Sequence, residues 1–163
     1  MLLITNGTII DPKNHFEGKE DLLIGDDGRI LKRAPSGELS AEHVFDASGC
    51  IVAPGLVDTH SHFRDPGFTY KEDLHTGSLA AAAGGYTSVI LMANTNPPVD
   101  SAEILTDILE RGRREQIHIY SAANVTKGMK GQEVNDLQAL AAAGAPVFTD
   151  DGKPILNEAV FTQ

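Results

Sequence analysis

From Pro54 onward, short apolar runs alternate with helical stretches, and this alternation constrains the fold more than any other feature of the 163-residue sequence. Such alternation is typical of β/α units built around a parallel sheet. The expected strands are residues 55–60, 87–92, 116–122 and 145–149. The expected helices are residues 71–83, a helix capped by Ser101, residues 133–143, and a last one that begins at Asn157 and is cut off at Gln163.

The first 53 residues have a different pattern of short apolar runs separated by turn residues, which predicts a small antiparallel sheet. Residues 2–10 form a strand pattern interrupted by Asn6-Gly7, and residues 21–25 and 29–33 flank a hairpin turn at Asp26-Asp27-Gly28, where Gly supplies the positive φ. Two further short runs, 44–46 and 51–53, bracket another turn. We therefore expect two parts, residues 1–53 and 54–163.

Four strands and three whole helices make up half of a closed eightfold β/α barrel, whose usual length is ~250 residues. A complete but smaller fold, an open doubly wound α/β sheet, could be built from the same units. The sequence pattern leaves both open, and the motifs below favour the first half of a barrel that stops before it could close.

Composition excludes several classes of function. The formal net charge of −10 repels phosphate backbones and anionic lipid surfaces, so neither nucleic acid nor membrane is an expected partner. The single cysteine, Cys50, requires no oxidising compartment, and no apolar run approaches the ~20 residues that span a bilayer. We expect a cytoplasmic protein.

His60 and His62 carry the strongest chemical signal. Side chains alternate along a strand, so the two imidazoles point to the same side, ~6.5 Å apart along the chain, where one metal ion could accept a nitrogen from each. A bare His-x-His is more often a pair of ordinary polar residues. Here the pair follows an apolar run and precedes a loop, as metal ligands do at the carboxyl end of a barrel strand.

Asp150 and Asp151 follow the fourth predicted strand, at the same end of the sheet. A carboxylate there suits a bridging ligand to zinc, whose partners are nitrogen, sulfur and oxygen donors. Either residue could serve, and an acidic turn ahead of Gly152 explains the pair equally well.

Arg64 and Asn94 are predicted on loops above the same face. Arg offers a planar fork for a carboxylate, and Asn offers both a donor and an acceptor, so together they suit an anionic amide or imide substrate. For either residue alone, a surface or turn role is at least as good an explanation.

The run from Ala53 to Gly67, APGLVDTHSHFRDPG, resembles the first-strand signature of the dihydroorotases in the amidohydrolase superfamily. Asn94-Thr95 and the turn Thr149-Asp150-Asp151-Gly152 are similar to the pattern of the bacterial type I branch. The resemblance extends over the whole chain. It implies an α/β fold, with the N-terminal half of a metal-dependent TIM-type barrel preceded by part of a small β-sandwich.

The resemblance also implies roles for individual residues. The family site holds one or two Zn²⁺ ions, and His60 and His62 would both bind the same ion. Asp151 would be the ligand at the position where other branches of the superfamily carry a carboxylated lysine. Arg64 and Asn94 would hold the substrate carboxylate. Two more histidine ligands and an aspartate general base come from later strands in the family, so no catalytic residue is assigned within this segment. The departures, Asp65 for a commoner Glu and Ala93 for a common Pro, touch no ligand.

The implied activity is the reversible, zinc-dependent conversion of N-carbamoyl-L-aspartate to dihydroorotate in pyrimidine biosynthesis. Hydantoinase, allantoinase and dihydropyrimidinase are related alternatives. An alternative from a different functional class is that the chain is a non-catalytic fragment or a subunit that folds only with a partner. The isolated 163-residue chain is expected to be inactive, and association with a second copy or with another pyrimidine-pathway enzyme is expected.

Overall fold

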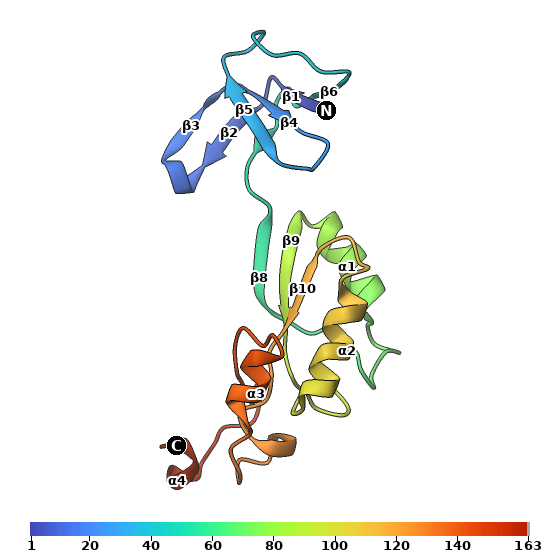
Figure 1. Cartoon of the computed structure of the whole chain (residues 1–163), viewed down its shortest axis with the longest axis vertical. Helices are drawn as coiled ribbons and strands as arrows, with labels where there is room; N and C mark the ends of the chain where they lie inside the picture. The colour runs from blue at the N-terminus through green and yellow to red at the C-terminus, as the bar shows by residue number, and fades with distance from the viewer. Residues whose placement is uncertain (163) are drawn as a thin grey trace. The chain divides into compact units, whose positions relative to one another are not determined.

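The computed structural model describes residues 1–162 and divides the chain into two compact units, residues 1–54 and the part that begins at Gly55 (Figure 1). No helix in the described range is long and apolar enough to cross a membrane. The interpretation of the two units as part of a sandwich and part of a barrel stays a prediction.

The first unit consists of seven short strands in two sheets. One sheet has the order β5-β4-β1-β6 and the other the order β3-β2-β7. The strands are β1 (Leu2–Thr5), β2 (Thr8–Asp11), β3 (Phe16–Lys19), β4 (Asp21–Ile24), β5 (Ile30–Ala34), β6 (His43–Asp46) and β7 (Ile51–Val52), with a 3-10 turn η1 (Pro12–Asn14) after β2.

The predicted hairpin is confirmed, because β4 and β5 pair antiparallel and Gly28 has a φ of 75°. The expectation of a purely antiparallel sheet is wrong: β1 pairs parallel with β6, and β2 pairs parallel with β7. The cause is the left-handed turn at Asn6, with a φ of 63°, which sends β1 and β2 into different sheets. The later strands β6 and β7 also lie in different sheets. β6 runs parallel to β1 in one sheet, and β7 runs parallel to β2 in the other. β3 was not predicted.

The second unit contains a parallel sheet in the order β10-β9-β8, formed by β8 (Leu56–Ser61), β9 (Tyr86–Leu91) and β10 (His118–Ser121). Helices α1 (Leu74–Ala83) and α2 (Ala102–Gly112) pack on the same side of it (Figure 1). The remaining elements are a 3-10 turn η2 (Lys127–Met129), α3 (Leu137–Ala142) and α4 (Glu158–Phe161).

The core of this unit lies between the sheet and the helices. Val89 and Leu91 of β9 belong to the same buried cluster as Leu105 and Ile108 of α2, and all four are at most 3% exposed. Each such side chain contributes about 1.5–3 kcal/mol when fully buried. The same alternation that buries these residues leaves the opposite face of the sheet free for other side chains.

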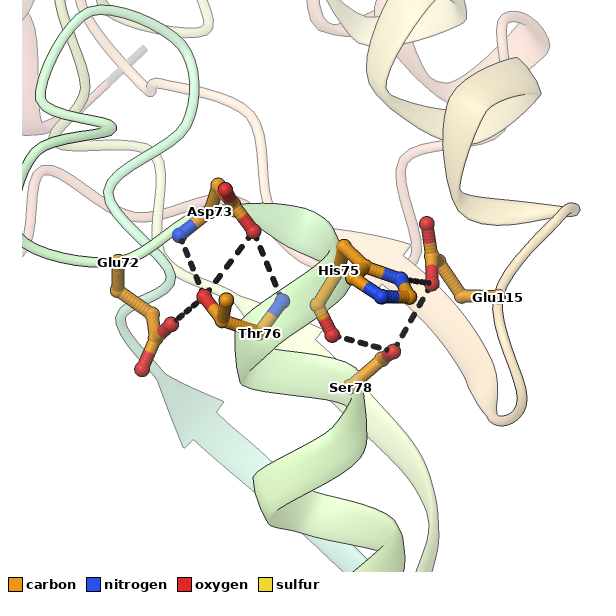
Figure 2. A network of polar contacts seen from close by, with 6 residues as sticks. All are labelled: Glu72, Asp73, His75, Thr76, Ser78 and Glu115. Carbon is orange, nitrogen blue, oxygen red and sulfur yellow. Dashed lines mark hydrogen bonds and ion pairs between the residues drawn. The ribbon is translucent and has the colours of Figure 1, made fainter.

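Helix α1 begins three residues later than predicted because Asp73 caps it. The Asp73 carboxylate accepts a hydrogen bond of 2.8 Å from the Thr76 N–H, and the Thr76 hydroxyl accepts one of 3.3 Å from the Asp73 N–H (Figure 2). This reciprocal capping box satisfies two helix-end donors. In the same helix, the buried Ser78 and the exposed His75 both contact Glu115, at 3.0 Å each, and so tie α1 to the segment after α2 (Figure 2).

The predicted helix over residues 133–143 is wrong at its start, because α3 begins at Leu137. Val134 instead forms an antiparallel bridge with Thr126, and the Asn135 N–H donates to the Val125 carbonyl at 2.8 Å. Asp136 then caps the helix by accepting from the Ala139 N–H. The contacts with residues 125 and 126 outweigh the local preference for a helix.

The predicted fourth strand over residues 145–149 is reduced to a single parallel bridge between Phe148 and Ala123. Pro146 has no N–H to donate to a ladder. Asn157 caps α4 as predicted, by accepting from the Ala159 N–H. The expected end of that helix at Gln163 lies outside the described residues.

Candidate metal and substrate site

The candidate site forms at the carboxyl end of β8, where His60 and His62 lie with ring centroids 5.3 Å apart. Asp58 braces this strand end. Its carboxylate accepts a hydrogen bond of 2.9 Å from the His60 N–H and one of 2.7 Å from the Ser61 hydroxyl. These two bonds, the first being the stronger influence, lower the pKa of Asp58 below its ordinary value. Asp58 therefore stays ionised while it fixes the backbone beside the imidazoles.

Asp151 contacts both imidazoles. Its Oδ1 lies 3.3 Å from Nε2 of His60, and its Oδ2 lies 3.5 Å from Nε2 of His62. One ligand atom from each of the three residues lies within 4.8 Å of the other two. Residues 91 positions apart in sequence are thus brought to one point.

Asp150 points elsewhere and is 8% exposed. Its Oδ1 accepts from the Val125 N–H at 2.9 Å and from the Thr126 N–H at 3.2 Å, and its Oδ2 accepts from the Thr126 hydroxyl. The residue pattern alone left open which of the two aspartates faces the histidines, and the family resemblance implied Asp151. In the structure Asp151 faces them, and Asp150 holds the loop that follows β10.

Asn94 lies at the centre of the group. Its Oδ1 is 3.0 Å from Nδ1 of His62, and its Nδ2 donates to Oδ2 of Asp151 at 3.0 Å. Because an amide oxygen only accepts, the first contact requires a proton on Nδ1, which leaves the Nε2 lone pair of His62 free. Asn94 therefore orients two of the three clustered side chains, a role that its position in the sequence did not suggest.

Arg64 lies beside Asn94, with one guanidinium nitrogen 3.5 Å from the amide oxygen. A pocket of about 410 Å³ opens next to this group and is lined in part by Phe68, Asn94, Thr95, Asp151 and Lys153. All five predicted site residues, His60, His62, Arg64, Asn94 and Asp151, therefore lie together.

The donor set fits a zinc ion. Two imidazole nitrogens and a carboxylate oxygen are ligands that zinc accepts, and three protein ligands leave a position for water or substrate in a catalytic site. The contact from Asn94 to His62 is the kind of outer hydrogen bond that fixes the tautomer of a metal-binding histidine. Sequence reasoning missed Asp58. An aspartate two residues before the N–H that it accepts from is a recognisable turn pattern and could have identified it.

Comparison with known proteins accords with this geometry. The family model described as dihydro-orotase-like matches residues 49–162. The chain belongs to this family. It is 50% identical over 163 residues to a dihydroorotase of Streptococcus pyogenes serotype M3, and 50% identical over 157 residues to one of Clostridium acetobutylicum. All of this chain matches the first relative and 96% of it matches the second.

The chain spans 38% of the length of the Streptococcus relative and 37% of the Clostridium relative. Among solved structures, an L-hydantoinase (dihydropyrimidinase) from Arthrobacter aurescens superimposes with a TM-score of 0.73 at 21% identity. The superposition covers 90% of this chain and 32% of that one. At this identity the likeness concerns the fold alone, and it agrees with an α/β protein.

Proposed function

We propose that this dihydro-orotase-like chain carries some of the metal ligands and the carboxylate-binding residues of a zinc-dependent cyclic amidohydrolase that interconverts N-carbamoyl-L-aspartate and dihydroorotate. The observation that carries the proposal is the Asp151 carboxylate, which contacts Nε2 of both His60 and His62. The match to curated dihydroorotases supports the substrate.

His60, His62 and Asp151 are the proposed zinc ligands. When bound, zinc supplies Lewis acidity toward a carbonyl oxygen and water with a pKa near ~7. Asp58 keeps the His60 backbone in place, and Asn94 keeps the His62 tautomer that presents Nε2. These side chains leave little to rearrange when the metal binds.

Arg64 is the proposed partner of the substrate carboxylate. Arg64 is half-buried, and its guanidinium lies beside Asn94, which lines the 410 Å³ pocket. A planar fork of donors there can pair with both oxygens of a carboxylate. Asn94 is the proposed second contact to that carboxylate. A local cation here also offsets the repulsion that a chain of net charge −10 exerts on an anionic substrate.

A β/α barrel is the proposed frame of the second unit. β8, β9 and β10 follow one another in chain order, and the bridge from Ala123 to Phe148 continues the same order beyond β10. In a doubly wound sheet with three strands in this order, the chain would next return to the other side of the first strand. Part of a β-sandwich is the proposed frame of residues 1–53, and cytoplasmic location and association with a partner stay predictions.

The test is an assay of the full-length protein against dihydroorotate, hydantoin, allantoin and dihydrouracil at equal concentration. We expect dihydroorotate to give the highest kcat/KM, and Arg64→Gln to raise KM for dihydroorotate at least roughly tenfold because it removes a charge-assisted pair with the substrate. Preference for a neutral ring would replace the proposal with the hydantoinase-type alternative. A metal-free, inactive full-length protein would favour the non-catalytic alternative.

A further inference from the structure

An ion pair between a buried carboxylate and a partly exposed guanidinium lies on the far side of the loop that carries Arg64. Asp65 is 6% exposed, and the Arg111 guanidinium of α2 donates to both of its carboxylate oxygens, at 2.8 Å and 2.9 Å. The hydrogen bond to the Asp65 carboxylate raises the pKa of Arg111, so the guanidinium stays charged throughout the physiological range. Two parallel hydrogen bonds fix the relative orientation of both groups, which a single point contact would not do.

Residues 62–65 divide between two environments. His62 and Arg64 contact Asn94, while Phe63 is buried and lies so close to Gly77 of α1 that a Cβ there would meet its ring at 2.6 Å. Asp65 reaches α2 in the same way. The residues that face the helices therefore anchor the chain, and the residues between them carry the candidate site chemistry.

The backbone at Arg64 needs such an anchor. Its φ is 62°, a left-handed conformation that residues other than Gly seldom adopt. The Phe68 N–H donates to the Arg64 carbonyl at 2.9 Å, and the Asn96 N–H donates to the Pro66 carbonyl at 3.1 Å. The loop is thereby tied at its far end, and Asp65 ties it next to Arg64 itself.

We propose that Arg111 is a positioning residue for substrate specificity. Through Asp65 it holds Arg64 in the left-handed conformation that places the guanidinium beside Asn94, and so it tunes the affinity for a substrate carboxylate without touching the substrate. The expected kinetic effect rests on the proposed function, in which Arg64 binds the substrate carboxylate. The structural half, the anchoring of the loop, stands independently of any activity.

The chain offers a matched control on the same arginine. Arg111 Nε also donates to Asp107, at 2.9 Å, one turn earlier on α2. The Asp107 side chain is 61% exposed, whereas that of Asp65 is 7% exposed. Asp107→Asn therefore perturbs Arg111 on its solvent side, and Asp65→Asn and Arg111→Gln disrupt the pair with the buried Asp65 carboxylate.

The first experiment is steady-state kinetics with dihydroorotate on the full-length protein. In Arg111→Gln and Asp65→Asn we expect KM to rise roughly tenfold with kcat changed by less than about threefold, because uniform binding is lost. Arg111→Lys, which keeps the charge but not the fork, should give an intermediate KM and also covers the case in which Arg111→Gln fails to fold. Asp107→Asn should match wild type. A KM at the wild-type value in Arg111→Lys and Asp65→Asn, with only the melting temperature lowered, would overturn the inference.

The second experiment is amide hydrogen exchange of peptides covering residues 62–70, which needs no activity. Faster exchange in Asp65→Asn and Arg111→Lys, but not in Asp107→Asn, is expected. Unchanged exchange would overturn the positioning role whatever the kinetics. If the wild-type protein does not turn over dihydroorotate, the proposed function fails, and the exchange result alone decides whether Arg111 anchors the Arg64 loop.

Discussion

Asp150 and Asp151 are adjacent residues whose side chains contact different parts of the second unit. Asp150 is buried against backbone donors after β10, and Asp151 turns toward two imidazoles. The sequence could predict that this turn bears carboxylates at the right end of a strand. The residue pattern alone could not show which aspartate faces the histidines, because that depends on the loop from Asn124 to Thr126, and only the family resemblance pointed to Asp151.

Substitution of the two aspartates should therefore give opposite results. Asp150→Ala leaves two N–H groups and a hydroxyl without their acceptor and should lower the free energy of unfolding by about 1–3 kcal/mol. Asp151→Ala should change stability much less but reduce zinc affinity by about 10-fold or more. Urea denaturation and zinc titration of both variants test this, and equal effects on both properties would contradict the division.

Asp21 should make the first unit sensitive to acid. The Gly37 N–H at 3.0 Å and the Ser36 hydroxyl at 2.8 Å donate to its buried carboxylate and lower its pKa, the backbone bond being the larger cause. A lowered pKa in the folded state contributes stability above the unfolded-state value of about 3.9, and this contribution is lost as the pH falls through the folded pKa.

The corresponding measurement is urea denaturation at pH 7 and at several values below 4. Asp21→Asn should lower stability at pH 7 by about 1–2 kcal/mol, and the difference from wild type should shrink toward the lowest pH. The exposed Asp27, substituted in the same way, serves as a control. A difference that is constant over this range would show that the Asp21 charge is not responsible.

At the scale of elements, local sequence determined most boundaries. The apolar runs of β9 and β10 and the caps at Ser101 and Asn157 were predictable because their signals lie within a few residues. The errors occur where distant partners compete. Val134 forms an isolated β-bridge with Thr126, and Phe148 forms one with Ala123 in place of the predicted strand. No local pattern contains these contacts.

The packing of α1 on the loop after β8 also depends on one position. Gly77→Ala should gain helix propensity, yet its Cβ would meet the Phe63 ring at 2.6 Å, so we expect a net loss of about 1–3 kcal/mol. Gly84→Ala is the control, because a Cβ there meets its nearest atom at 3.4 Å and the φ of −83° suits any residue. Thermal melts that rank Gly84→Ala below Gly77→Ala would contradict this account of the packing.

At the scale of the whole molecule, apolar surface remains accessible in the described chain. Leu56 and Val57 of β8 are 52% and 60% exposed, and within residues 1–162 this strand pairs only with β9. Strand edges with exposed apolar side chains promote association. The relatives are much longer than this chain, so the sequence could predict only those site residues and strands that lie within these 163 residues.

A polypeptide limited to residues 1–163 should therefore associate in solution. We expect concentration-dependent size in analytical ultracentrifugation, binding of a hydrophobic dye and no dihydroorotase activity. Val57→Lys, which places a charge on the edge strand, should shift the distribution toward monomer. A sharp monomer with a cooperative melt and no dye binding would show that the exposed edge has no such effect.

The most direct test of the central claim is the zinc content of the full-length protein, measured by mass spectrometry beside a His60→Ala/His62→Ala double variant of equal fold. We expect stoichiometric zinc and dihydroorotase activity in the wild-type protein, and loss of both in the double variant, whose circular dichroism stays unchanged. Full metal content and full activity in the double variant would contradict the assignment of the site.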